Sequence, residues 1–151
     1  MQQSVENSDR STARTLYQRI ETKLGVEPLR SDHDLVTLVE RRLPVRTLTS
    51  LTNHGLAEQE IYALVLPRRT LAHRRAKHQL LTREESDKVV RLARITSLAE
   101  QIFNDEKKAA RWLRQSKRRF GSNTALDLLT TEAGARLVEE ILYQIDHGMA
   151  A

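Results

Sequence analysis

A helix-start signal at residues 82–85 opens the longest periodic segment of the chain. Thr82 is followed three positions later by Glu85, which is the spacing of a capping box, where each side chain accepts a hydrogen bond from the backbone N–H of the other residue. The small and apolar side chains beyond it recur every three or four positions, as they do along one face of an α-helix. They are Val89, Leu92, Ala93, Thr96, Ala99 and Phe103. We expect one helix over residues 81–104 that links an N-terminal module to a C-terminal one.

Helix signals also recur through the rest of the chain. Leu16, Ile20 and Leu24 are spaced four residues apart, and Thr131 precedes an apolar stripe that ends at Gly148. Further start signals are Ser31, Pro44, Asp105 and Thr124. No segment alternates with the period of a strand, and Leu, Ala, Arg and Glu outnumber β-branched and aromatic residues. The sequence therefore predicts an all-α protein.

The same patterns divide the chain into segments. Residues 1–12 are polar and small and show no periodicity, which predicts a disordered N-terminus. We expect a helical domain over residues 13–80, the linking helix over 81–104, and a C-terminal helical domain over 105–151.

Composition excludes several classes of protein. There is no Cys, so disulfides, thiol chemistry and Cys-based zinc sites are excluded. The longest apolar run, residues 61–66, stops at a proline and is far shorter than the roughly 20 residues needed to cross a bilayer. The N-terminus lacks the apolar core of a signal peptide. We expect a soluble, cytoplasmic protein with no membrane partner.

Catalytic signatures are missing as well. The histidines are scattered, and no pair lies four residues apart with a Glu between, as in zinc proteases. Dispersed glycines cannot form a loop that cradles phosphate, and most carboxylates fall in helix first turns, where the helix dipole explains them. We expect no enzyme activity, no catalytic residues, no cofactor and no metal site.

Residues 66–75 read Leu-Pro-Arg-Arg-Thr-Leu-Ala-His-Arg-Arg and predict a basic helix. At 100° per residue Leu71 points to one side and Arg69, His73 and Lys77 to the other, which suits a helix packed on a small domain and facing a polyanion. A shorter helix over residues 57–65 precedes it, as in a helix-turn-helix.

In that interpretation, Arg69 and His73 face base edges and the other cations reach phosphates. The predicted DNA-binding residues are Arg68, Arg69, Thr70, His73, Arg74, Arg75 and Lys77. A solvated basic helix, or a basic hairpin that binds an acidic protein, would carry the same charges.

Charge is segregated elsewhere too. Residues 107–119 carry seven basic side chains and no acidic one, whereas residues 127–151 are acidic apart from Arg136. Such segregation indicates more than one charged partner surface, or an acidic tail that folds over the second basic cluster.

Together these segments resemble the Xre/MbcA/ParS antitoxins of bacterial type II toxin–antitoxin pairs over roughly residues 45–151. The N-terminal part of the resemblance lies in residues 66–75 and in Leu81-Thr-x-Glu-Glu-Ser86 with Val90-Arg-Leu-Ala-Arg-Ile95. The C-terminal part lies in Ala110-Arg-Trp-Leu113, Phe120-Gly121, Ala125-Leu-Asp-Leu-Leu-Thr130, Glu132-Ala-Gly134 and Ile145-x-x-Gly148.

The resemblance implies an Xre-like helix-turn-helix module and a C-terminal domain that caps the active site of a RES-domain toxin. Such toxins consume NAD or transfer ADP-ribose from it, so the enzyme would be the partner. The residues implied for toxin contact are Asp146, His147, Gly148, Met149, Ala150 and Ala151. Trp112 and residues 128–129 would belong to the core of that domain.

The sequence departs from the family pattern in one loop, with Gly121-Ser122 for a double glycine and Ala125 where a proline is frequent. The function predicted is an antitoxin that blocks its toxin, binds operator DNA to regulate its own operon, and forms a homodimer, as helix-turn-helix proteins usually do. The alternatives are a stand-alone transcription regulator whose C-terminal domain dimerises, and a protein-interaction module that never touches DNA.

Overall fold

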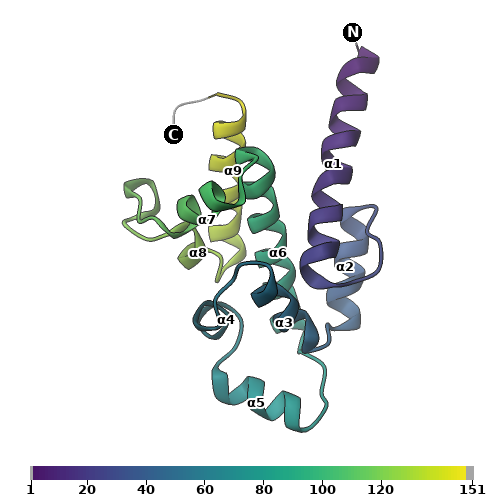
Figure 1. Ribbon diagram of the computed structural model, residues 1–151, viewed down its shortest axis with the longest axis vertical. Helices are drawn as coiled ribbons and strands as arrows, with labels where there is room; N and C mark the ends of the chain where they lie inside the picture. The colour runs from purple at the N-terminus through teal and green to yellow at the C-terminus, as the bar shows by residue number, and fades with distance from the viewer. Residues whose placement is uncertain (1, 149–151) are drawn as a thin grey trace.

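The computed structural model describes residues 2–148, and its regular elements within that range are all helices (Figure 1). The all-α prediction is confirmed. The elements are α1 (Gln2–Leu24), α2 (Asp32–Arg41), α3 (Arg46–Asn53), α4 (Glu58–Leu64), α5 (Arg68–Ala76), α6 (Arg83–Phe103), α7 (Glu106–Arg114), the 3-10 turn η1 (Arg118–Phe120), α8 (Ala125–Leu128) and α9 (Glu132–Asp146).

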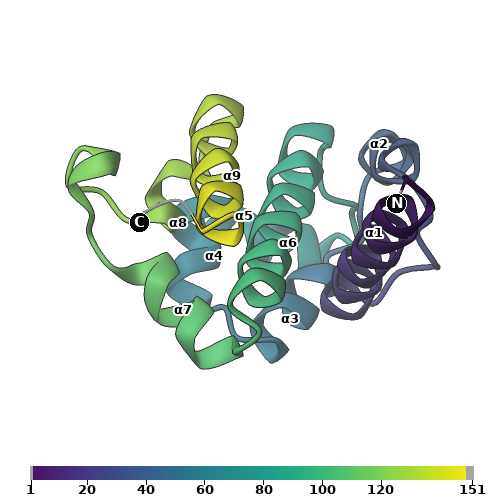
Figure 2. The same cartoon turned by 90° about the horizontal axis from the view of Figure 1, so that it is seen from above.

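Helix α6 is the centre of the molecule. Every side chain from Val89 to Ala99 is buried except Arg94, because α1, α2, α3, α7 and α9 all pack on it. Figures 1 and 2 show α1 and α2 on one side of α6, and α7 and α9 on the other. The helix expected to link two modules is therefore the core that both of them share.

Capping geometry confirms the predicted helix starts except the one at Pro44, since α3 begins at Arg46 with Val45 at its N-cap and no side-chain cap. The Thr82 hydroxyl accepts from the Glu85 N–H at 3.0 Å, and the Glu85 carboxylate accepts from the Thr82 N–H at 2.9 Å. The other side-chain caps are Ser31 for α2, Asp105 for α7, Thr124 for α8 and Thr131 for α9.

The N-terminus differs from its prediction. Residues 1–12 are predicted to be disordered, but α1 runs without a break from Gln2 to Leu24, and its N-terminal end lies beyond the other helices in Figure 1. Ile20 and Leu24 are fully buried and fix the second half of the helix. Extending a helix that is already formed costs far less than nucleating one, which explains why a polar segment continues it.

The C-terminal domain closes around an aromatic cluster. Trp112 is half-buried and lies between Phe103 and Phe120, with ring centroids 5.7 and 6.1 Å away. The segment after α7 makes the short η1 turn and then reverses at Gly121, whose φ of +63° lies in the left-handed region. Within residues 2–148 no helix combines the length and apolar character needed to cross a bilayer.

Candidate nucleic-acid interface and C-terminal contact surface

Helices α4 and α5 form the short helical pair expected from the sequence. Three residues, Val65 to Pro67, join them, and Pro67 occupies the N-cap position of α5 with φ −61° and ψ 151°. Leu64, Val65 and Leu66 are buried, so apolar packing fixes a turn that contains no glycine. The α5 helix forms one edge of the molecule, far from α9 (Figure 1).

The side chains of α5 divide as the sequence predicted, with one exception. Leu71 is only 3% exposed and is the buried residue of the helix. Thr70 and Arg74 are half-buried. The remaining predicted DNA-binding residues are exposed, namely Arg68, Arg69, His73, Arg75 and Lys77.

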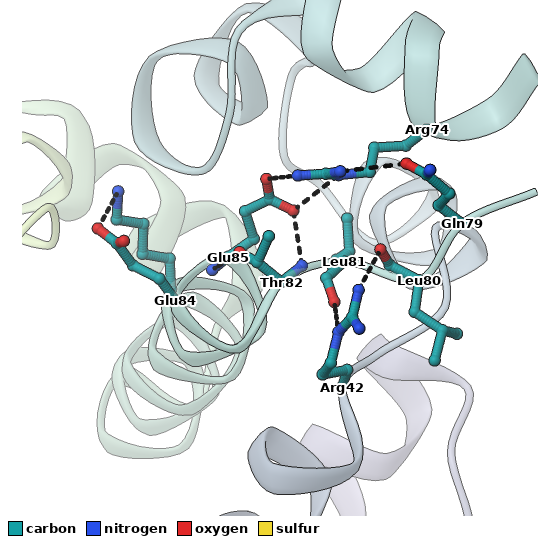
Figure 3. Close-up of polar contacts among 9 residues, drawn as sticks. Arg42, Arg74, Gln79, Leu80, Leu81, Thr82, Glu84 and Glu85 are labelled. Carbon is teal, nitrogen blue, oxygen red and sulfur yellow. Dashed lines mark hydrogen bonds and ion pairs between the residues drawn. The ribbon is translucent and has the colours of Figure 1, made fainter. Parts of the chain in front are cut away.

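Arg74 is the exception, because its guanidinium is bound within the chain (Figure 3). It donates to both carboxylate oxygens of Glu85, at 2.9 and 3.3 Å, and to the side-chain oxygen of Gln79 at 3.2 Å. The two charged side chains are 19% and 12% exposed. Arg74 was predicted to reach a phosphate, whereas the structure places it as a tie between α5 and the first turn of α6.

Glu85 performs two tasks, since it also caps α6 through the Thr82 N–H. Burial alone would raise the pKa of its carboxyl. The hydrogen bonds from Arg74 and Thr82, together with the positive charge of Arg74, outweigh burial and leave the pKa of Glu85 below its ordinary value. The carboxylate is therefore held in the charged form that the tie requires.

A second arginine fixes the segment between α5 and α6, and no sequence pattern pointed to it. Arg42 donates to the carbonyls of Leu81 at 2.7 Å and Leu80 at 3.2 Å (Figure 3). Its backbone has a φ of +63°, which non-glycine residues rarely adopt. The adjacent Leu43 accepts from the Leu81 N–H at 2.8 Å and donates to Ser86 at 2.9 Å. The α5–α6 connection is thus clamped to the end of α2.

Two of the charges on α5 are placed against the helix dipole, whereas His73, Arg74 and Arg75 in its last turn are placed with it. Arg68 and Arg69 lie in its first turn, which contains no acidic side chain, although the dipole favours acids there. This arrangement does not stabilise the helix itself. It does suit an anionic partner, since the cations and the free N–H groups of the first turn would face the same ligand.

Of the predicted toxin-contact residues 146–151, the structure describes residues 146–148, and these lie at the C-terminal end of α9. Asp146 is the last residue of the helix and is exposed. The His147 ring nitrogen Nδ1 lies 2.6 Å from the Tyr143 carbonyl, and Gly148 donates its N–H to Ile145 with a φ of +73°. Met149, Ala150 and Ala151 lie outside the described residues.

The acidic C-terminal segment directs two of its carboxylates at α6. Glu139 pairs with Arg94 at 2.7 Å and Glu132 with Arg91 at 3.4 Å. In the second basic cluster, Arg114 pairs with Glu60 of α4 at 2.8 Å. Arg119 of the same cluster donates to the side-chain oxygen of Gln144 in α9 at 2.7 Å, so a hydrogen bond joins the two segments.

A hollow of about 540 Å³ lies between α1, the α3–α4 turn and α7. Three of the charges on its wall are used within the fold, because Glu100 pairs with Lys23 at 2.5 Å and with Arg19 at 3.6 Å. Across residues 2–148, no cluster of three His, Cys, Asp or Glu residues is close enough to hold a metal ion.

Two family models match this chain in succession. Residues 34–94 match the antitoxin Xre-like helix-turn-helix domain, and residues 98–148 match the antitoxin Xre/MbcA/ParS C-terminal toxin-binding domain. The boundary between the two matches falls inside α6. This position agrees with a central helix that both halves use.

Three curated proteins named antitoxin Xre are similar in sequence. One from Pseudomonas putida is 37% identical over 86% of this chain and 82% of its own length. One from Photorhabdus laumondii is 28% identical over 82% of this chain and 86% of its own length. One from Yersinia enterocolitica is 32% identical over 56% of this chain and 57% of its own length.

Proposed function

The chain belongs to the Xre family of antitoxins, and from that membership we propose that it blocks the active site of a RES-domain toxin and binds operator DNA to regulate its own operon. The toxin would consume NAD or transfer ADP-ribose from it. The antitoxin would act by occupying the cleft, without chemistry of its own. Each half of the proposal assigns a different surface of the fold to a different partner, the end of α9 to the toxin and α5 to DNA.

The toxin half is supported by the match of residues 98–148 to a toxin-binding domain and by the position of α9. Val138, Ile141 and Leu142 bury one face of α9, so the end of the helix is carried on a packed element. Residues 146–151 follow directly, where they would enter the cleft. Asp146 would add a negative charge in a site that accepts an anionic dinucleotide.

The observation that carries the DNA half is α5 itself. It exposes four of the seven predicted contact residues, with Lys77 exposed at its C-cap, while Leu71 anchors it, and it would follow α4 as the second helix of a helix-turn-helix. Arg69 and His73 would face base edges, with Arg68, Arg75 and Lys77 on phosphates. A homodimer would place two such helices on successive major-groove sites of a palindromic operator.

A truncation separates the two halves. Removing residues 146–151 should abolish toxin neutralisation and leave operator binding unchanged. The matched control removes six residues from the other end, residues 2–7 of α1, which extend away from the body in Figure 1. This control should retain both activities. A 146–151 truncation that still neutralises the toxin would refute the proposed contact site.

Operator binding is tested on the intact protein by a gel shift with the DNA upstream of its gene. The affinity should exceed that for unrelated DNA, and it should fall steeply as salt increases because phosphate contacts release counterions. Equal affinity for both DNAs would refute autoregulation but leave the toxin half intact.

A further inference from the structure

The second basic cluster is not used by either half of the proposed function, and α7 carries most of it. Ala109 and Leu113 are buried, and this fixes which side of α7 faces the core. Lys107, Lys108 and Arg111 are exposed and project from the opposite side, within about 100° of one another at 100° per residue. We name these three residues the α7 cationic face.

The cations of this face repel one another. Lys107 and Arg111 are four residues apart, and Lys108 and Arg111 are three apart, which are the spacings at which side chains on a helix are neighbours. No carboxylate of residues 2–148 forms an ion pair with Lys107 or Arg111. The like charges therefore oppose folding slightly, and an acidic partner would relieve the repulsion.

The face is presented on a rigid support. The Asp105 carboxylate caps the start of α7 by accepting from the N–H groups of Lys107 and Lys108, at 2.9 and 3.1 Å. At the other end Arg114 donates to Glu60 at 2.8 and 2.9 Å and to the Gly55 carbonyl at 3.0 Å. A helix held at both ends can present charges in a fixed pattern, which favours binding to a matching surface.

The position of the face argues against the DNA that α5 would bind. In both Figure 1 and Figure 2, α4 lies between α5 and α7. A duplex seated on α5 would therefore lie beyond α4 from the cationic face. The other neighbour of α7 is the α8–α9 unit, and Figure 2 shows α7 and α9 on the same side of α6.

We propose that the α7 cationic face is a docking surface for an acidic patch on the toxin, separate from the C-terminal residues that would enter its cleft. This inference rests on the proposed function, because residues 98–148 match a toxin-binding domain and include α7. The face attracts the toxin and orients it. Its contribution is thus greatest in the rate of association, as is usual for exposed charges at the rim of an interface.

The test is a charge reversal, Lys107→Glu with Lys108→Glu and Arg111→Glu, compared with Arg10→Glu, Arg30→Glu and Arg41→Glu. The control residues are exposed and lie outside α5 and α7. Each triple variant lowers the formal net charge by six, from +5 to −1. The intermediate variant Lys107→Gln, Lys108→Gln, Arg111→Gln separates lost attraction from new repulsion.

The association rate with purified toxin is measured at low and high salt, with operator affinity and thermal melting in parallel. The α7 reversal should slow association roughly tenfold or more at low salt, less at high salt, and the glutamine variant should fall between. The control triple should stay within about twofold of wild type. The melting temperature of the α7 variants should fall only slightly, because Lys108 loses the contact between its Nζ and the Phe103 ring, whose centroid is 5.7 Å away.

Equal slowing in both triples would overturn the inference, because net charge alone would then explain the effect. Unchanged association in the α7 variant, or a loss confined to operator affinity, would overturn it as well. If the wild-type protein does not bind the toxin at all, the proposed function fails first, and that result is distinct from a failure of this surface.

Discussion

The Arg74 guanidinium donates hydrogen bonds to both carboxylate oxygens of Glu85, and this pair joins α5, at the edge of the molecule, to the central helix α6. The buried side chain of Leu71 also holds α5 against the rest of the protein. A helix with so few contacts depends on each of them for its orientation. Arg74 is therefore a positioning residue for the proposed DNA contact.

Positioning and contact can be separated by salt dependence. Arg74→Ala should weaken operator binding roughly tenfold by loosening α5, since hydrogen bonds between charged groups contribute about 1.5–3 kcal/mol. It should leave the slope of log affinity against log salt unchanged, because no phosphate contact is lost. Arg68→Ala, at an exposed position on the same helix, should flatten that slope by about one unit.

Arg75→Ala is the neighbouring control and should behave like Arg68→Ala, because Arg75 is exposed as well. Arg74→Lys keeps the charge but loses the two-pronged geometry, so it should recover only part of the affinity. A slope that falls by one unit in Arg74→Ala would show that Arg74 does touch a phosphate.

The Arg74–Glu85 pair also predicts how stability depends on pH. The pKa of Glu85 is lowered in the folded protein from its ordinary value of 4.5. Its contribution to the free energy of unfolding is therefore complete above pH 4.5 and is lost as the pH falls from there through the folded pKa. Urea unfolding of wild type and Glu85→Gln should differ by roughly 1–3 kcal/mol at pH 7 and much less near pH 3. A difference that stays constant between these two pH values would contradict the assignment.

Glu85 also shows what the sequence could and could not predict. Its cap on Thr82 follows from a three-residue spacing, so the pattern revealed it. Its bond with Arg74, eleven residues upstream, depends on the angle at which α5 meets α6, and no local pattern contains that angle. The Arg42 clamp on the Leu80 and Leu81 carbonyls was hidden for the same reason.

Helix α6 shows a second limit. Its apolar stripe predicted the helix and one packed face, but Ser97 is fully buried and Arg91 is 8% exposed, on sides that the stripe does not mark. The sequence predicts this helix only as a link between two modules. Only the packing of helices on all sides shows that the two halves share one core.

Arg91 should consequently be important for stability. Its guanidinium donates to the Leu129 carbonyl at 3.2 Å and to Asp87 at 2.5 Å, and it lies 3.4 Å from Glu132. It joins α6 to the end of α8 and the start of α9. Arg91→Ala should lower the free energy of unfolding by about 1–3 kcal/mol, because the buried carbonyl loses its donor. Arg136→Ala, at an exposed position, should change it by less than about 0.5 kcal/mol in the same urea titration.

Gly134 is a position where adding a single methyl group should destabilise the protein. A Cβ at this residue would lie 1.9 Å from the Leu128 carbonyl oxygen and 2.8 Å from its carbon, and backbone atoms cannot rotate out of the way as a side chain can. The turn between α8 and α9 would have to open, which would also strain the bond from the Gly134 N–H to the Thr131 hydroxyl. Elsewhere in a helix, Gly→Ala stabilises by roughly 0.5–1 kcal/mol. Here overpacking should dominate and Gly134→Ala should destabilise by about 2 kcal/mol or more.

Ala133→Gly, at the exposed neighbouring position, is the control and should cost only about 1 kcal/mol from helix propensity. Urea unfolding measures both variants, and a Gly134→Ala protein as stable as wild type would mean that α8 and α9 do not approach each other this closely.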